Sequence, residues 1–207
     1  VKKNSTIGYS ANVIDCPPTL KDREETLQKV IDQTGASAMH PYNDMDVIEG
    51  NSTATMELLE DYPDLDAIFA PIGGGGLISG ACLAAKYFSN AKVYGAEPEG
   101  ADDAYRSFQK GEIIPMVNPQ TIADGLRTSL GEIGFEIMKT HLDSVFTVSE
   151  SEIISAMKWM WQKMKIIIEP SSAVPLAALI KNHELFKDQQ VGIIISGGNV
   201  DLDNLPF

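Results

Sequence analysis

The chain has 207 residues, 43% of them hydrophobic and 22% charged, and a formal net charge of −13. This composition is typical of a folded globular protein, and the length suits one sizeable domain, or one domain and a piece of another. The acidic surface disfavours nucleic acid and anionic membranes as partners, no apolar stretch approaches the ~20 residues that span a bilayer, and two cysteines without a CxxC pattern fit the reducing cytoplasm.

The first forty residues predict a small βαβ-like piece. A short strand is expected at 11–15, and Pro17-Pro18 then opens an amphipathic helix over 20–34. A second short strand is expected at 37–40.

After this piece, buried apolar runs alternate with stretches of helical period. The composition shifts near 40–46, so we expect a partial small domain at 1–43 and a larger domain at 44–207. The alternation is typical of α/β proteins with a mostly parallel sheet and helices on both faces. The expected strands lie at 66–72, 92–96, 145–148 and 191–195, and the expected helices at 47–62, 77–88, from 102 onward, 150–165 and 170–182.

Four consecutive glycines, Gly73 to Gly76, follow a buried strand and open a helix at Leu77. Backbone N–H groups and the positive end of a helix dipole converge at such a position, which favours a phosphate group. Leu77-Ile78 stands where a P-loop requires Lys-Ser/Thr, so that class is excluded. A dinucleotide fingerprint stays open as an alternative, because Glu97 ends the next strand about twenty residues on, although Ser79 replaces its third glycine.

Carboxylates follow the strand at 92–96. Glu97 ends this strand, and Asp102 and Asp103 lie in the first turn of the next helix. Such hard oxygen ligands suit Mg²⁺ or Ca²⁺. The acids could equally serve as N-terminal helix charges, and the residues alone leave both interpretations open.

A hydroxyl group lies at the end of the last expected strand. Ser196 follows the apolar run 191–195 and precedes Gly197-Gly198. Open α/β sheets bind ligands at the carboxyl ends of their strands. Two glycine-flanked strand ends in one chain therefore suggest one pocket built from both.

Five motifs, taken in order, resemble those of serine racemase and the serine/threonine dehydratases. These are pyridoxal-phosphate enzymes with the tryptophan-synthase-β fold, and the resemblance extends from residue 1 to about 202. It implies a large domain of that fold together with part of a small αβ domain. The motifs are Pro71-Ile72-Gly73-Gly74-Gly75-Gly76-Leu77, Ala96-Glu97-Pro98, Thr121-Ile122-Ala123-Asp124-Gly125, Ile168-Glu169-Pro170-Ser171-Ser172-Ala173 and Ser196-Gly197-Gly198-Asn199-Val200-Asp201.

The resemblance implies roles for the residues of these motifs. Gly73, Gly74, Gly75, Gly76 and Leu77 would cradle the cofactor phosphate, and Ser196 would hydrogen-bond the pyridine nitrogen. Gly125 would be a backbone neighbour of the ring, and Glu169 a polar residue near its far side. A neutral hydroxyl at the ring nitrogen would leave the ring a weaker electron sink than an aspartate would.

Further sites are implied by position. Glu97, the Ala101 carbonyl and Asp103 match the family's divalent-metal site, for Mg²⁺, Ca²⁺ or Mn²⁺. Lys165 and Asn199 match positions of an ATP-type effector site near the subunit interface of a homodimer.

The chain departs from the family pattern in several places. The family often has an asparagine or an aromatic residue after His-Pro; here Tyr42 follows His40-Pro41, so this position offers no asparagine contact to the ring, although Asn43 is adjacent. Gly50-Asn51-Ser52-Thr53 replaces Gly-Gln-Gly-Thr. The family's Schiff-base lysine lies in a Ser-x-Lys-x-Arg-Gly motif that none of the thirteen lysines shows, and the Ser-Gly-Asn-His loop is also missing.

We therefore expect a C-terminal portion of a longer enzyme, or a chain completed by a second polypeptide. With its lysine, the enzyme would racemise serine, or convert serine or threonine to pyruvate or 2-oxobutanoate and ammonia. A non-catalytic ligand-binding module that keeps the cradle without the nucleophile is the second interpretation, and a dinucleotide-binding oxidoreductase the third.

Overall fold

The computed structural model describes residues 2–17 and 20–207 and divides the chain into two compact units, the first ending at His40 and the second beginning at Pro41. The first unit contains the helices α1 (Lys2–Gly8) and α2 (Leu20–Thr34). The second helix has the expected bounds. Pro18, expected to open it, lies outside the described residues.

The two strands expected in the first unit are wrong. Residues 11–15 and 37–40 form no strand, and most of their side chains are exposed. A strand requires a neighbour that satisfies its backbone N–H and C=O groups. Neither segment has a strand neighbour among the residues that the structure describes, so their apolar residues do not produce a sheet.

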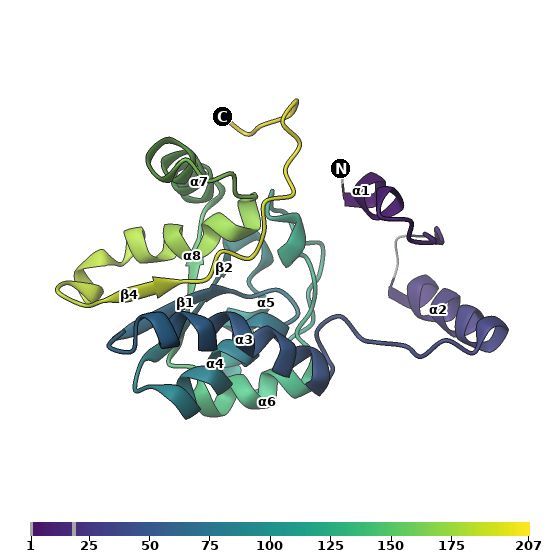
Figure 1. Cartoon of the computed structure of the whole chain (residues 1–207), viewed down its shortest axis with the longest axis horizontal. Coiled ribbons are helices and arrows are strands. Elements are labelled where there is room, and N and C mark those ends of the chain that lie inside the picture. Colours follow the sequence, from purple (N-terminus) through teal and green to yellow (C-terminus); the bar gives the residue numbers. More distant parts are fainter. Residues whose placement is uncertain (1, 18–19) are drawn as a thin grey trace. The chain divides into compact units, whose positions relative to one another are not determined.

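The second unit is built on a four-stranded parallel sheet with the strand order β3-β2-β1-β4. Each strand corresponds to one of the apolar runs that predict it. Figure 1 shows the strands in the middle of this unit, between two layers of helices. The strands are β1 (Ala67–Pro71), β2 (Lys92–Pro98), β3 (Ser144–Val148) and β4 (Val191–Ile193).

Helices cover both faces of this sheet, as expected for an α/β protein. On one face α3 (Met45–Asp61), α4 (Gly76–Phe88), α5 (Asp103–Lys110) and α6 (Glu132–His141) enclose one apolar core. On the other face α7 (Glu150–Met164) and α8 (Pro170–Lys181) enclose a second core. Short 3-10 helices lie at η1 (Glu99–Ala101), η2 (Asp124–Leu126) and η3 (His183–Phe186).

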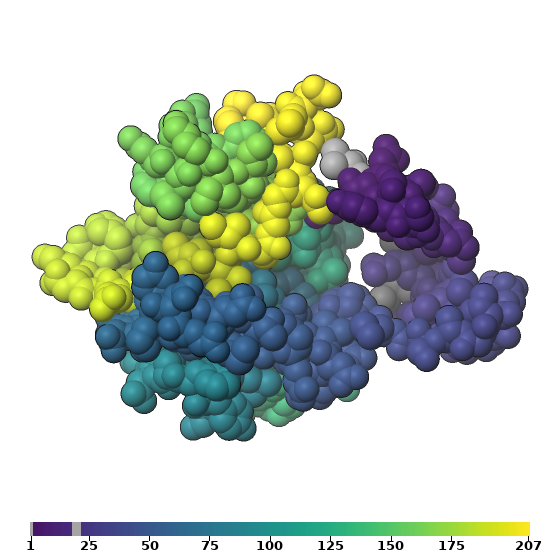
Figure 2. All heavy atoms as spheres, in the orientation of Figure 1, coloured from purple at the N-terminus to yellow at the C-terminus, as the bar shows by residue number. Residues whose placement is uncertain are grey.

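The chain after β4 lies on the surface beside α7. Figure 2 shows this last segment in yellow next to the green atoms of α7. The ring of Phe207 meets the ring of Trp161 edge to face, with 5.6 Å between centroids, and Lys158 lies over the same Phe207 ring. Among the helices that the structure describes, none has the length and apolar composition of a membrane span.

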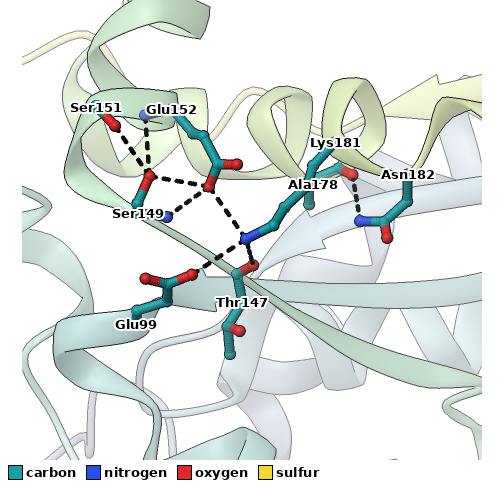
Figure 3. A network of polar contacts seen from close by, with 8 residues as sticks. All are labelled: Glu99, Thr147, Ser149, Ser151, Glu152, Ala178, Lys181 and Asn182. Carbon is teal, nitrogen blue, oxygen red and sulfur yellow. Dashed lines mark hydrogen bonds and ion pairs between the residues drawn. The ribbon is translucent and has the colours of Figure 1, made fainter.

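A polar network around Lys181 ties the end of α8 to the sheet edge (Figure 3). The Lys181 ammonium group donates to Glu99, to Glu152 and to the Thr147 carbonyl at 3.1–3.2 Å. Ser149 caps α7 and shares a reciprocal capping box with Glu152. Partial burial opposes both charges, but these contacts lower the pKa of Glu152 and raise the pKa of Lys181. The network thus joins α8, β3 and the turn that follows β2.

Lys181→Met is expected to lower the free energy of unfolding by about 1 kcal/mol, because the lysine is partly exposed and water screens its ion pairs. Urea unfolding measures the change, and added salt should shrink it. Lys187→Met, which removes the same charge from an exposed position, is the control. Equal effects of the two substitutions would contradict a role for the network.

Candidate functional site

The glycine loop joins β1 to α4 and is closely packed. Gly75 is the N-cap of α4 and has φ +93°, a left-handed conformation that favours glycine. A Cβ built on Gly73 would lie 2.9 Å from the Gly125 carbonyl oxygen, and one on Gly74 would overlap the ring of Tyr42. The loop therefore has no room for side chains at these positions.

This loop offers backbone donors to an anion. The amides of the first turn of a helix have no acceptor within the helix, and they carry the positive end of its dipole. The hydrogen bonds of this segment instead use carbonyl groups, since Gly74 accepts from the Gly131 amide and Gly75 from the Ser79 amide. The start of α4 thus has the geometry that a phosphate group requires.

The two residues after Pro41 have separate contacts. Tyr42 packs its ring against the glycine loop. The Asn43 carboxamide oxygen accepts from the Ile133 amide at 3.0 Å, in the first turn of α6. Asn43 therefore caps α6, and the chain entering the second unit holds both α4 and α6.

A second group of predicted residues lies beside the glycine loop. The Gly125 amide donates to the Ser171 hydroxyl at 3.2 Å, which ties the η2 turn to the start of α8. A Cβ on Gly125 would lie 4.0 Å from a Glu169 carboxylate oxygen, and one on Gly197 would lie 3.1 Å from the same atom. The structure therefore brings Gly73, Gly125 and Glu169 together with the loop after β4.

Ser196 is held by a buried serine of α8 whose role no sequence motif indicates. The Ser172 hydroxyl lies 3.0 Å from the Ser196 hydroxyl, and it contacts both the amide and the carbonyl of Gly197 at 2.7 Å. Ser172 is buried, whereas Ser196 is exposed. Ser172 of α8 and Ser196 of the loop after β4 thus form a hydroxyl pair beyond the carboxyl end of β4.

The acidic pair lies after β2 and is buried. Glu97 and Asp103 are each 1% exposed, and Ala101 is buried beside them. The Glu97 carboxylate accepts from the amides of Ala104 and Tyr105, and the Asp103 carboxylate from that of Leu130. These bonds leave room at each carboxylate for a further partner.

Burial dominates the ionisation of this pair. Burial, together with the nearby Asp103 charge, raises the pKa of Glu97 to about 9, against the hydrogen bond from the Tyr105 amide. Burial also raises the pKa of Asp103 to about 6, while the Leu130 amide and the Arg106 charge lower it. A bound cation would offset the energetic cost of burying the two ionised carboxylates. Within the described ranges no three His, Cys, Asp or Glu side chains form a metal cluster, so the Ala101 carbonyl and water would have to complete a shell here.

The acidic pair lies on the face of the sheet that α4 and α5 cover. Neighbouring side chains of a strand point to opposite faces, so Glu97 points away from Ala96. Ala96 belongs to the apolar core under α7 and α8, on the side of η2 and Glu169. The pair thus points to the α4 side, and Leu130, whose amide donates to Asp103, would lie 3.3 Å from a Cβ on Gly75.

Two of the remaining predicted residues, Lys165 and Asn199, lie on the surface. Lys165 is the C-cap of α7 with φ +60° and is exposed, as is Asn199. A Cβ on Gly198 would lie 2.6 Å from the Ile167 carbonyl, so the segments after α7 and β4 run side by side. Leu77 is partly buried in the first turn of α4.

Comparison with known proteins adds three similarities. The pattern of one family, described as pyridoxal-phosphate dependent enzyme, matches residues 1–197. The chain is 48% identical to the beta-hydroxyaspartate dehydratase of Paracoccus denitrificans, over 100% of this chain and 66% of that protein. It is 50% identical to the serine racemase of Dictyostelium discoideum, over 99% of this chain and 65% of that protein.

Solved structures agree with the sequence matches. The Dictyostelium discoideum serine racemase structure superposes with a TM-score of 0.91, over 97% of this chain and 66% of that one. The maize serine racemase structure superposes with a TM-score of 0.93 at 39% identity, over 97% of this chain and 64% of that one. The expected α/β fold of the tryptophan-synthase-β type is confirmed. The chain spans about two thirds of the length of its curated relatives.

Proposed function

This chain belongs to the pyridoxal-phosphate dependent enzyme family, and we propose that it forms the cofactor-binding part of an enzyme that racemises a small hydroxy amino acid or eliminates ammonia from it. One observation supports this most directly. The glycine loop before α4 and the Ser172–Ser196 hydroxyl pair both lie at the carboxyl edge of neighbouring strands, β1 and β4, with Gly125 and Glu169 between them.

The residues present fit the cofactor. The loop Gly73 to Gly76, with Leu77 behind it, would hold the phosphate through its amides, because a cradle without Cβ atoms lets oxygen atoms approach the backbone. Ser196 would hold the pyridine nitrogen. When bound, pyridoxal phosphate supplies an electron-accepting ring that acidifies the α-hydrogen of an amino acid.

The other residues near this cluster would orient the ring. The turn at Gly125 brings its backbone beside the loop, and the Glu169 carboxylate lies near both Gly125 and Gly197. A neutral hydroxyl at the ring nitrogen favours proton removal followed at once by elimination or reprotonation, since it stabilises negative charge less than a carboxylate would.

The substrate is proposed from the relatives. The names of similar proteins point to serine, threonine and 3-hydroxyaspartate. Each of these is an amino acid with a hydroxyl group on its β-carbon. The 207 residues contain no Ser-x-Lys-x-Arg-Gly motif. We propose that the lysine that holds the cofactor and moves the α-proton comes from a further part of the protein or from a second chain.

Finer features are proposed in the same way. Glu97, Asp103 and the Ala101 carbonyl would bind Mg²⁺, Ca²⁺ or Mn²⁺, since two buried carboxylates with raised pKa values favour a cation. Lys165 and Asn199 would contact an ATP-type effector. Residues 1–43 would be part of a small domain and 44–207 the cofactor domain, in a cytoplasmic homodimer. Both described cysteines are free, which agrees with a reducing compartment.

Two alternatives stay distinct from this proposal. A module that binds the cofactor without catalysing a reaction would keep the cradle and lack the lysine. The dinucleotide-binding oxidoreductase loses its support, because the family match covers the motifs at 121–125 and 168–173, which a dinucleotide fold does not require.

An intact-mass and activity measurement on the protein isolated under native conditions tests the proposal. We expect a Ser-x-Lys-x-Arg-Gly segment in the same chain or in a bound second chain. We also expect formation of a 2-oxo acid and ammonia, or of a D-amino acid, from serine, threonine or 3-hydroxyaspartate. A lone 207-residue species that forms neither product with added pyridoxal phosphate would instead support the non-catalytic module.

A further inference from the structure

Ser172 lies in the first turn of α8, and its hydroxyl oxygen has three hydrogen-bonding partners. Its side chain is 1% exposed. The Gly197 amide donates to this oxygen at 2.7 Å, the hydroxyl donates to the Gly197 carbonyl at 2.7 Å, and the Ser196 hydroxyl lies 3.0 Å away. Three partners from the loop after β4 therefore meet at one buried atom.

The Ser172 hydroxyl can meet its three partners in two ways. A serine hydroxyl has one hydrogen and two lone pairs. One lone pair of Ser172 takes the Gly197 amide hydrogen, so only the hydrogen and the second lone pair remain for the Gly197 carbonyl and for Ser196. When Ser172 donates to the Gly197 carbonyl, it can accept from Ser196, and when it donates to Ser196, the hydrogen of Ser196 is free to point outward.

The Gly197 carbonyl has a hydrogen-bond partner in either direction of the Ser172 hydroxyl hydrogen. It also accepts from the Glu169 amide at 3.1 Å, so it keeps a partner when the Ser172 hydrogen turns to Ser196. A buried carbonyl that lost its last partner would oppose this rotation by about 1–3 kcal/mol. The start of α8 is thus built so that Ser172 can supply Ser196 with a donor or with an acceptor.

We propose that Ser172 positions Ser196. It holds the Ser196 hydroxyl against the cofactor's ring nitrogen and lets that hydroxyl donate a hydrogen bond to the nitrogen. The inference rests on the proposed function, because it takes Ser196 as the contact of that nitrogen. Ser172 itself, buried behind Ser196, acts through it. Removing the Ser172 hydroxyl would leave the Ser196 side chain without its buried partner and the Gly197 amide without an acceptor.

Two ligands that differ only at the ring nitrogen test the proposal. The first is pyridoxine phosphate, which has no aldehyde and so does not react with surface lysines, and the second is its analogue with CH in place of the ring nitrogen. The ratio of their dissociation constants, measured by equilibrium dialysis, reports the hydrogen bond to that nitrogen and cancels general damage to the site.

The wild-type chain is expected to bind pyridoxine phosphate about tenfold more tightly than the analogue, which is the effect of one good hydrogen bond. Ser196→Ala should abolish this preference. Ser172→Ala should reduce it to about threefold or less, and Ser172→Thr, which keeps the hydroxyl, should restore it. Ser89→Ala is the matched control, because Ser89 also donates to a carbonyl and accepts from an amide, at the far end of α4.

The outcomes separate the inference from the proposed function. A tenfold preference that Ser196→Ala abolishes and Ser172→Ala leaves intact would overturn the role of Ser172 alone. If the wild-type chain binds neither ligand, or Ser196→Ala keeps the preference, the placement of the cofactor is wrong and the inference with it. Melting curves identify any variant that does not fold. If Ser172→Ala is one of them, Ser172→Cys takes its place, because a thiol is a weak donor and acceptor, and an unchanged tenfold preference in that variant would overturn the role of Ser172.

Discussion

Gly73→Ala is expected to weaken the binding of pyridoxine phosphate by at least about a hundredfold. This factor corresponds to the loss of two charge-assisted hydrogen bonds to the phosphate. The new methyl group would lie 2.9 Å from the Gly125 carbonyl oxygen and 3.4 Å from the Leu126 Cα. Both are backbone atoms, so the glycine loop or the η2 turn must move. The amides that would hold the phosphate belong to that loop. After the displacement, their N–H groups would no longer point toward one phosphate group. Equilibrium dialysis measures the change.

Gly50→Ala is the matched control for this substitution. Gly50 lies in α3, and a Cβ there would meet no atom within 4 Å. Alanine in a helix is favoured over glycine by about 1 kcal/mol, so this variant should be slightly more stable and bind as the wild type does. Wild-type affinity in Gly73→Ala, with an unchanged melting temperature, would show that the loop does not hold the phosphate.

Without a divalent cation, the stability of the protein is expected to fall as the pH rises from about 4.5 toward about 9. In the folded state Glu97 keeps its proton up to a pKa of about 9, whereas in the unfolded chain it loses the proton near the ordinary value of 4.5. The unfolded state therefore binds fewer protons in this window, and the free energy of unfolding decreases with pH. Asp103 adds to the fall between the ordinary value of 3.8 and about 6.

Mg²⁺ should oppose this loss, because it binds the ionised carboxylates. Its stabilisation is thus expected to be larger at about pH 9 than at about pH 5. Thermal unfolding with Mg²⁺ and with a chelator measures both effects. Glu97→Gln should flatten the pH dependence and abolish the response to Mg²⁺. Glu112→Gln, which removes the same charge from an exposed side chain, should change neither. An equal Mg²⁺ effect at both pH values would contradict the metal site.

The sheet could be predicted from the sequence because its strands coincide with apolar runs bounded by turn residues, of which Ala67–Pro71 is buried along its whole length. Helix α6 could not be predicted in this way. The side chain that caps it, by accepting from the Ile133 amide, belongs to Asn43, ninety residues earlier in the chain. Long-range contacts of this kind leave no local pattern. The strands expected before His40 show the opposite error, a local pattern without the neighbours that a strand needs.

Helix α7 shows the limit of periodicity. Helical spacing predicts an inward stripe of Ile154, Met157, Trp161 and Met164. The structure buries Met157 but leaves Met164 54% exposed, and Ile153 takes the place of Ile154 in the core. The direction in which a helix turns its apolar face depends on the layer above it, here α8, and an ambiguous apolar pattern does not fix it.

For the candidate site, the strand ends and the glycine loop could be found from the sequence, because parallel strands end at one edge. Ser172 received no role of its own, since its partners in the loop after β4 lie about twenty-five residues further along the chain. A buried serine at the start of a helix gives no signal beyond its helical position. Only the fold shows that its hydroxyl faces Ser196 and Gly197.

The central claim is that the glycine loop before α4 holds the phosphate of a pyridoxal-type cofactor. Its most direct test compares pyridoxine phosphate with pyridoxine on the wild-type chain, because the two ligands differ only in the phosphate group. We predict that the phosphorylated ligand binds at least about a hundredfold more tightly, through the amides of the loop. Equal affinities, or no binding of either ligand, would contradict the account.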